Sequence, residues 1–495
     1  FPTALRAHGY PGGPDLLFVL SSNFDLSLSG GSLATIDIGI AEEVGALCAG
    51  AGGAGGVCLG YGAQGYPRIH SGAVMNCLDA VRVSSFARDL ALSADGLNLY
   101  APSGGDDSLT WVEVHPERAT DPRGDGRGVL SCYAAAGAAP DLDALLAANA
   151  QQGCPGGDLG DLDVFSVPVC NDLHRPRPAL ANDYEDYCAD PTNPNHTPPP
   201  VGLDPCPLEH MPGAPFAVAL SADGRLAHVT HLDSGALSVF QIVGGVGPGD
   251  DGRPSYVNTF DSVDLANGVS FHPTSALVFV TGRSAVNAAA GTRLAVYETA
   301  AIADEPEPFL PPPDAAEGAD APPPAVDPHV TTLSIAADAG HDLRGITFSA
   351  DGTRGYLVER SAGGDVLVVL DTAGVMRGDF VMPPMAAVAV GKGAQNVALI
   401  EGALPSGGRL VLVSCFTDDS IYMVDDAVME VVGVVKVDRG PFGMALWTPD
   451  GAAAPRRLFV SSFTAATVSA VDVEPASPSF GEVRYAIGPP RESEQ

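Results

Sequence analysis

The sequence predicts an all-β fold built from repeated units of four short antiparallel strands. Three observations support this. Short apolar runs are separated by Asp-Gly or Gly-rich turns, which reverse a chain tightly because Gly accepts positive φ and Asp caps its own turn. No long stretch keeps the 3.6-residue apolar period of a helix. Gly and Pro make up 59 and 43 of the 495 residues, a composition that favours turns over long helices.

The clearest unit starts at Pro215. Its first strand ends in Ser-Ala-Asp-Gly-Arg, and a second strand (226–230), a small polar turn and a third strand (236–242) follow. The stretch 457–473 repeats this pattern, with a fourth strand at 482–487. Similar units start near residues 2, 86, 215, 267, 344, 395 and 442. The shortest spacing is about 50 residues, the size of one propeller blade, so we predict a seven-bladed β-propeller of four-stranded antiparallel blades.

This repeat resembles the YVTN-type seven-bladed β-propeller repeat family. The resemblance lies in Ser-Ala-Asp-Gly-Arg, a strand, a small polar turn and then Val-x-Val-x-Asp; the two halves of the motif correspond to 458–463 and 467–472. It covers all seven units and departs from the pattern in the first and fourth. It implies the propeller fold. Proteins that resemble this pattern include surface antigens, binding scaffolds and, among more distant relatives, lactonases and dehydrogenase subunits, so the resemblance does not select an activity.

We interpret residues 1–495 as a single propeller interrupted by three segments. Residues 41–79 form a Cys-rich insertion around a run of Gly and Ala that we expect to pack no core. Residues 116–213 form a second Cys-rich insertion, in which 141–152 is predicted to be helical. Residues 303–328 form a loop rich in Pro and acidic residues, of a composition typical of extended chain.

The cysteines indicate an oxidising compartment. Eight of the nine lie in the first 206 residues, in loop-rich segments where disulfides are typical, and no Cys-x-x-Cys pair occurs. We therefore expect an exported protein, in the periplasm, at the cell surface or outside the cell; because the chain begins at Phe1, we expect any signal peptide to have been removed. The ninth, Cys415, is predicted to be a buried free thiol, with a reactive thiol or a copper ligand as the alternative. The disulfide candidates are Cys48, Cys58, Cys77, Cys132, Cys154, Cys170, Cys188 and Cys206.

The charge of the chain excludes some partners. With 25 Lys and Arg against 60 Asp and Glu, the net charge is −35, which repels nucleic acid and anionic membrane surfaces. No apolar run reaches the roughly 18–20 residues that a membrane-spanning helix needs. We expect a protein or a glycan partner, on the basis of the repeat fold, the Cys-rich insertions and the absence of a catalytic motif.

Four polar residues near the ends of second strands are candidates for ligand binding at the axial rim. With Leu237, Val366 and Ile421 in register, Thr230, Glu359 and Ser414 occupy equivalent positions, and the residues after them also coincide. The candidates could bind an anionic or carbonyl ligand or perform acid–base chemistry, and ordinary loop hydrogen bonds are the alternative. They are His231, Asp233, Glu359 and Arg360.

No metal or other cofactor is predicted, and calcium and copper are the alternatives. The acidic turns 121–126 and 249–252 resemble calcium loops but lack the full ligand spacing. The pair His210 and Met211 would suit copper. His228 and His231 are three residues apart, a spacing that directs them to opposite faces of a strand.

Two functions follow from these observations. The first is a secreted or cell-surface propeller that serves as a binding scaffold for a protein or glycan. The alternative is a lactonase-like hydrolase or a metal-dependent redox enzyme that uses the axial funnel. Because Gly-x-Ser-x-Gly, Walker A and His-Glu-x-x-His motifs are absent from the sequence, we lean towards a protein that is not an enzyme.

The cysteine counts predict a disulfide between the two Cys-rich insertions. The first contains three cysteines and the second five. Both numbers are odd, so if all eight cysteines form disulfides, each insertion has one cysteine that must pair outside it. Such a bridge would join the insertions into one cap beside blades 1 and 2 and stabilise the fold by roughly 2–4 kcal/mol. Peptide mapping under non-reducing conditions should find a peptide pair that links them. Bridges confined within each insertion would contradict the prediction.

Overall fold

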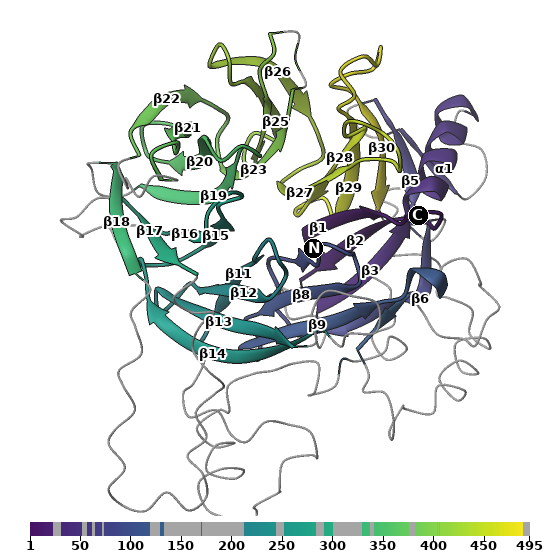
Figure 1. Cartoon of the computed structure of the whole chain (residues 1–495). Coiled ribbons are helices and arrows are strands. Elements are labelled where there is room, and N and C mark those ends of the chain that lie inside the picture. Colours follow the sequence, from purple (N-terminus) through teal and green to yellow (C-terminus); the bar gives the residue numbers. More distant parts are fainter. Residues whose placement is uncertain are drawn as a thin grey trace, which may run out of the picture.

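The computed structural model describes residues 1–22, 31–51, 57–61, 65–71, 74–118, 129–132, 170, 212–243, 252–283, 292–299, 329–336, 341–375, 382–402, 404 and 406–488. Its strands form seven sheets around a central axis, each with four strands in antiparallel order (Figure 1). The predicted seven-bladed β-propeller is confirmed. Among the described residues the helical elements are one α-helix, α1 (Ile38–Ala51), and a short 3-10 turn, Pro116–Arg118.

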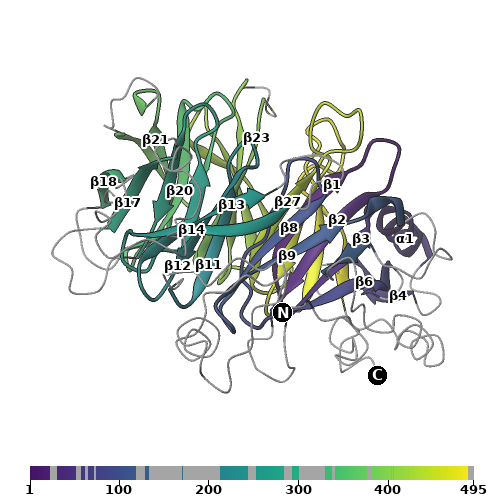
Figure 2. The same ribbon diagram turned by 60° about the horizontal axis from the view of Figure 1, so that its bottom comes forward.

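Each of the first four blades is made from its own stretch of sequence, and its strands lie side by side in chain order. Figure 2 shows this arrangement from a second direction for β11 to β14. The strands of blades 1 to 4 are, in turn, β1 (Pro2–Gly9), β2 (Asp15–Ser21), β3 (Gly31–Asp37) and β6 (Met75–Val83); β7 (Ala91–Leu92), β8 (Asn98–Ser103), β9 (Ser108–Val114) and β10 (Leu130–Ser131); β11 (Pro215–Leu220), β12 (Leu226–His231), β13 (Ala236–Val243) and β14 (Arg253–Asp261); and β15 (Gly268–Phe271), β16 (Leu277–Thr281), β17 (Thr292–Glu298) and β18 (His329–Ala336).

The last three blades follow the same plan, and blade 7 carries two additional strands from the N-terminal region, β4 (Cys58–Tyr61) and β5 (Pro67–His70). The strands of blades 5 to 7 are β19 (Asp342–Phe348), β20 (Arg354–Arg360), β21 (Val366–Asp371) and β22 (Pro384–Ala389); β23 (Ala394–Ile400), β24 (Leu410–Cys415), β25 (Ser420–Asp425) and β26 (Glu430–Lys436); and β27 (Pro441–Trp447), β28 (Arg457–Ser462), β29 (Thr467–Asp472) and β30 (Val483–Gly488).

The Ser-Ala-Asp-Gly turns connect first and second strands by local hydrogen bonds. In blade 3 the hydroxyl of Ser221 donates to Asp223 over 2.6 Å, and the same carboxylate accepts from the Arg225 N–H over 3.1 Å. Gly224 has φ +70°, a conformation that costs a residue with a side chain more than it costs Gly. The turn therefore depends on these residue types, which is why it can be read from the sequence.

The hydrophobic core lies between the blades. A cluster of buried apolar side chains fills the space between each pair of neighbours, because both faces of every sheet are covered by the adjacent sheets. The interface between blades 7 and 1 also includes residues of α1, β4 and β5. The ring therefore closes over a core to which residues outside the repeat contribute.

Residues 38–51, 57–61 and 65–70, here called the closing segment, join blade 1 to blade 7. The chain leaves β3 of blade 1, forms α1 with its N-terminus capped by Asp37 (Ile40 N to Oδ1, 3.0 Å), and reaches the outer edge of blade 7. There β5 pairs in parallel with β30, with Ile69 opposite Ile487. In Figure 1, α1 lies outside β5 and β30.

Side chains hold α1 against blade 7. The guanidinium of Arg457 donates to both carboxylate oxygens of Glu42 (2.9 and 2.8 Å), and the Tyr485 hydroxyl donates to the same carboxylate over 2.9 Å. Gly45 allows this close approach, because a Cβ there would lie 2.5 Å from Cδ1 of the Tyr485 ring. α1 buries Ile38, Ala41 and Cys48 between blades 1 and 7, so the first Cys-rich insertion does contribute to the core. Ala46, Ala49 and Gly50 of the Gly/Ala run are exposed, and residues 52–56 lie outside the described residues.

The two Cys-rich segments are integrated with blades 1 and 2. The fourth strand of blade 1, β6, starts at Met75, so Cys77 lies on a blade strand, and β10 lies inside 116–213. The N–H of Cys170 donates to the Arg82 carbonyl of β6 over 3.1 Å, which places part of the second segment against blade 1. The predicted helix 141–152 and the loop 303–328 lie outside the described residues.

Two disulfides are present, Cys48–Cys58 and Cys132–Cys170, and each lies within one insertion. Cys415 is free and buried, as predicted. The predicted bridge between the insertions would join Cys77, whose side chain is not described, to one of three cysteines outside the described residues (Cys154, Cys188 and Cys206). It stays a prediction, narrowed to a bond between Cys77 and one of these three.

Within the described ranges, no helix has the length and apolar character to cross a membrane.

Glu42→Ala should lower the free energy of unfolding by about 1–3 kcal/mol, because it leaves the buried Arg457 guanidinium without its two hydrogen bonds to Glu42. The neighbouring Glu43 is exposed, so Glu43→Ala is the matched control and should change stability little. Urea unfolding measures both variants. Hydrogen exchange should also become faster in β5 and β30 of Glu42→Ala alone. Equal stability of the two variants would contradict this account of the closing segment.

Candidate functional site

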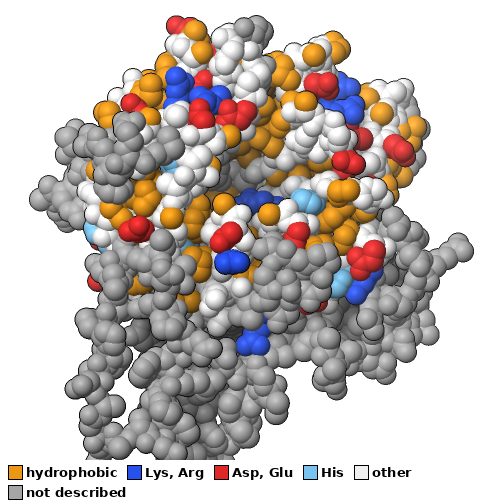
Figure 3. Space-filling view, in the orientation of Figure 1, with side chains coloured by type: hydrophobic (Ala, Val, Ile, Leu, Met, Phe, Trp, Pro, Cys, Tyr) orange, Lys and Arg blue, Asp and Glu red, His pale blue; other side chains and the backbone are white. Residues whose placement is uncertain are grey.

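An axial cavity of about 400 Å³ lies where the innermost strands of the blades converge. Every blade lines it with its first strand or the residues just before it. Figure 3 shows the face of the ring seen in Figure 1, hollowed at its centre, with Lys or Arg side chains at the floor of the hollow. The cavity is the site that the ring itself creates, and its lining decides what it can bind.

One mouth of the cavity gathers the starts of the inner strands and the ends of the second strands. Antiparallel pairing requires this: Asp342 at the start of β19 pairs with Arg360 at the end of β20, and Pro215 pairs with His231. The turns between second and third strands also lie at this mouth. The predicted rim residues therefore belong to the end of the cavity where the inner strands begin.

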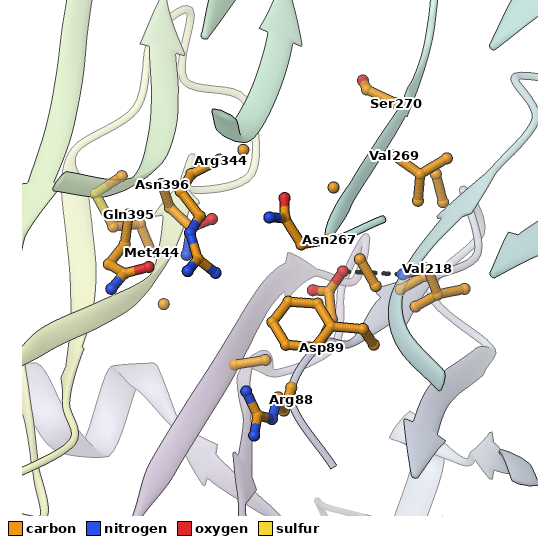
Figure 4. A pocket seen from close by; sticks show the side chains of 18 of the residues that line it. Arg88, Asp89, Val218, Asn267, Val269, Ser270, Arg344, Gln395, Asn396 and Met444 are labelled. Carbon is orange, nitrogen blue, oxygen red and sulfur yellow. Dashed lines mark hydrogen bonds between the residues drawn. The ribbon is translucent and has the colours of Figure 1, made fainter. Parts of the chain in front are cut away.

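Four arginines from three blades lie at this mouth, which we call the arginine mouth. They are Arg88 of blade 2, Arg283 after β16 of blade 4, and Arg344 and Arg360 of blade 5. Arg344 donates to Asp342 (Nη2–Oδ2, 2.7 Å; Nε–Oδ2, 2.9 Å), and Arg360 lies 3.9 Å from the same oxygen. Arg344 and Arg360 thus share one carboxylate, and Asp89 of blade 2 also lines the cavity (Figure 4).

Polar amides complete the lining beside Arg344. Asn267 donates to Asp342 Oδ1 over 3.3 Å, and Figure 4 shows its side chain pointing towards Arg344 and Asn396. The inner strands of blades 5 and 6 contain β-bulges, between Leu343 and Ile346 and between residues 394 and 397. Because a bulge changes the direction of the side chains on its strand, it can direct Arg344 and Asn396 into the cavity.

Burial and mutual repulsion perturb the arginines. The pKa of Arg344 is lowered by burial, partly offset by Asp342, with Arg360 and Arg283 lowering it further. The pKa of Arg88 is lowered by burial and by the charge of Arg344, partly offset by Asp233. The Arg88 guanidinium also lies over the Phe216 ring, 4.9 Å from its centre. Burial is thus the main cause of both shifts, and the acidic neighbours Asp342 and Asp233 offset part of it.

Asp233 and Arg360, two of the predicted rim residues, take part in this cluster. Arg360 approaches Asp342, and Asp233 lies close enough to Arg88 to raise its pKa. His231 is fully buried, with its ring nitrogens 2.8 Å from the Ser238 hydroxyl and 3.3 Å from the Gly213 carbonyl. Burial lowers its pKa to about 4. Its ligand-binding role stays a prediction.

Glu359 differs from the residues at the equivalent position of other blades. Thr230, Ser414 and Ser461 each place a hydroxyl that accepts a hydrogen bond from the N–H of the neighbouring inner strand, over 3.1, 3.2 and 2.8 Å. The pairing register confirms that Glu359 occupies this position in blade 5. Its carboxylate instead pairs with His341, and both side chains are largely buried. Blade 5 thus has an acid–base pair where its neighbours have a structural hydroxyl.

Sequence reasoning missed Arg88, Arg344, Asn267, Asn396 and His341. A signal for the first two was available: each lies five residues before the serine of a Ser-Ala-Asp-Gly turn, at 93 and 349. Aligning the units on this serine, rather than on the strand after the small turn, would have placed both arginines at one mouth.

Among the described residues, no group of three or more His, Cys, Asp or Glu side chains is placed to hold a metal ion. His210, Met211 and the acidic turns 121–126 and 249–251 lie outside those residues. Cys415 is buried, and burial raises the pKa of its thiol to about 12. The prediction that no cofactor is bound is untested.

Comparisons with known proteins return structural likenesses only. No protein-family model and no curated protein matches the chain. Solved structures with a similar fold include Kuenenia stuttgartiensis hydrazine synthase (12% identity, TM-score 0.49, 95% of each chain covered) and a periplasmic gluconolactonase of Pseudomonas aeruginosa (13%, 0.47, 89% of this chain and 86% of that one). A functionally unknown protein of Desulfotomaculum acetoxidans is 14% identical, with a TM-score of 0.35 over 52% of this chain and 65% of that one. At these values no function can be transferred, and the fold rests on the strand pairing of the chain itself.

Low pH should destabilise the protein through His228. This side chain is fully buried without a hydrogen-bond partner in the described structure, and burial lowers its pKa from 6.5 to about 3. Between pH 6.5 and 3, His228 is therefore protonated in the unfolded state but neutral in the folded state. The contribution of neutral His228 to the free energy of unfolding is complete above pH 6.5 and is lost as the pH falls towards 3. The expected loss between pH 7.5 and 4.5 is about 2–3 kcal/mol.

His228→Leu should remove this part of the pH dependence without lowering stability at pH 7.5. Urea midpoints at the two pH values test it, with His329→Leu as the control because His329 is exposed. An unchanged pH dependence in His228→Leu would contradict the assignment.

Proposed function

We propose that this propeller binds a small organic anion in its axial cavity at the arginine mouth. The observation that carries the proposal is the pair Arg88 and Arg344, whose pKa values are lowered by burial and, for Arg88, by the charge of Arg344. Both side chains belong to the cavity lining, and an anionic group placed between them would accept charge-assisted hydrogen bonds from both guanidinium groups.

The charge distribution indicates how such an anion would be recognised. The whole chain has a net charge of −35, and the four arginines lie among the acidic residues Asp89, Asp233, Asp342 and Glu359. An anion would therefore be selected by direct contact with the guanidinium groups rather than by long-range attraction. Guanidinium groups match the planar, two-oxygen geometry of carboxylates, and a volume of about 400 Å³ suits a small molecule.

A lactone or ester hydrolase is the second candidate, and the pair His341–Glu359 favours it. A carboxylate that orients a histidine is a common arrangement for removing a proton from water. A screen of lactones and esters against wild type, Glu359→Gln and His341→Asn examines this candidate. Turnover lost in both variants would favour it over a purely binding role.

The sequence also predicted a protein or glycan partner and an exported location. We retain export as a proposal, and the two disulfides support it, because such bonds persist in oxidising compartments. The protein or glycan partner stays a prediction, since no described surface favours one.

Arg344→Gln should weaken binding of gluconate and of inorganic phosphate by at least about tenfold, because it removes a charge-assisted hydrogen bond and one positive charge. Isothermal titration calorimetry at low salt measures the affinities. Arg484→Gln is the matched control, since Arg484 is exposed on the outer strand of blade 7. Binding that Arg344→Gln leaves unchanged, or that Arg484→Gln weakens equally, would count against the site.

A further inference from the structure

The arginine mouth has an aromatic side. Phe416 and Phe463 directly follow the second strands of blades 6 and 7, and Phe1 precedes the first strand of blade 1. The rings of Phe1 and Phe463 are stacked, 5.0 Å apart with a 22° angle between their planes, and the rings of Phe416 and Phe463 lie 6.3 Å apart. We call these three residues the phenylalanine row.

Backbone hydrogen bonds place the row at the same mouth as the arginines. The N–H of Phe416 donates to Gly393 over 2.8 Å, and that of Phe463 donates to Gly440 over 2.8 Å. These glycines lead directly into the inner strands β23 and β27, which begin at the arginine mouth. Phe416 and Phe463 are only partly buried, and Phe1 is 40% exposed.

The two sides are continuous through blade 6. The Asn396 side chain lies against Gly345, since a Cβ on Gly345 would be 2.9 Å from its Oδ1. The same side chain donates to the Phe442 carbonyl over 3.0 Å, and Phe442 of blade 7 is a lining residue of the cavity. The lining therefore passes from Arg344 of blade 5 through Asn396 of blade 6 to Phe442 of blade 7.

The exposed outer rim of blades 6 and 7 does not extend the positive charge. Lys392 and Arg439 lie there, but so do Asp418 and Asp419, so charges of both signs surround the row. The mouth therefore has guanidinium and carboxylate groups over blades 2, 4 and 5, and aromatic rings over blades 6, 7 and 1 that lie outside the cavity lining itself. Partly exposed rings at a cavity mouth can bind the apolar part of a ligand, because apolar groups gain free energy when a ligand covers them.

We infer that the ligand of this site is an amphipathic anion, with one acidic group and a flat apolar or aromatic body. The acidic group binds Arg88 and Arg344, and the body lies against Phe463 and Phe416. This inference rests on the proposed anion-binding function and names the chemical class of its ligand. Aromatic stacking favours such a body over a polyhydroxylated one, which would leave the rings uncovered by apolar surface.

Three probes test the inference on the full chain by calorimetry. 2-Naphthoate combines the acid and the rings, gluconate has the acid alone, and 2-naphthalenemethanol has the rings alone. We expect 2-naphthoate to bind at least about threefold more tightly than either of the others. A gluconate or naphthalenemethanol affinity equal to that of 2-naphthoate overturns the inference.

Variants separate the inference from the proposed function. Phe463→Leu keeps an apolar side chain but loses the ring, and should weaken 2-naphthoate about two- to tenfold while leaving gluconate unchanged. Phe416→Leu is the second variant, should Phe463→Leu fail to fold, as judged by circular dichroism. The matched control is Phe480→Leu, because Phe480 is partly buried in the loop between β29 and β30, at the other end of blade 7.

The outcomes distinguish the two proposals. If Arg344→Gln weakens both anions while the Phe463 and Phe416 variants bind 2-naphthoate like wild type, the amphipathic ligand is excluded and the anion site stands. If Arg344→Gln changes neither anion, both proposals fail. If Phe480→Leu weakens 2-naphthoate binding as much as Phe463→Leu does, the role of the phenylalanine row is also overturned.

Discussion

The parallel pairing of β5 with β30 closes the ring on which the rest of the structure depends. In the described part of the chain, the four repeat strands of each blade come from one stretch of sequence, so no repeat strand of the last blade is shared with the first. The closing segment supplies this link: its backbone extends the sheet of blade 7, while α1 and β3 tie it to blade 1. Backbone hydrogen bonds and a buried ion pair, Arg457–Glu42, thus act at the one joint that the repeat leaves open.

The closed ring keeps two positively charged side chains, Arg88 and Arg344, close together in the cavity lining. Arg88 and Arg344 are far apart in the sequence, yet they lie close enough for the charge of Arg344 to lower the pKa of Arg88. Their repulsion and burial cost free energy, and the apolar clusters between neighbouring blades offset it. The same clusters leave little freedom for the blades to separate and relieve the repulsion. The proposed anion site therefore needs no ligand to keep its shape.

Blade 5 departs from the repeat where function is expected. Glu359 replaces a hydroxyl that three other blades use to satisfy an inner-strand N–H, and the same blade contributes Arg344 and Arg360. When one unit of a repeat lacks the residue that stabilises the fold at the same position of other units, that position is a candidate functional site. Blades 1 and 2 also lack the hydroxyl, with Leu20 and Pro102 at the equivalent positions, but of these three blades only blade 5 has an ionisable side chain there.

The sequence by itself determined the blades and their register. Ser-Ala-Asp-Gly turns and alternating apolar residues act over a few positions, so the strands, the equivalence of Thr230 with Glu359 and the burial of Cys415 could be read directly. Only the tertiary structure decided the site and the closure. The arginine mouth assembles side chains from blades 2, 4 and 5, and α1 depends on Gly45 lying against Tyr485 of the last strand. These contacts join residues hundreds of positions apart, and no local pattern specifies which distant residues the closed ring brings together.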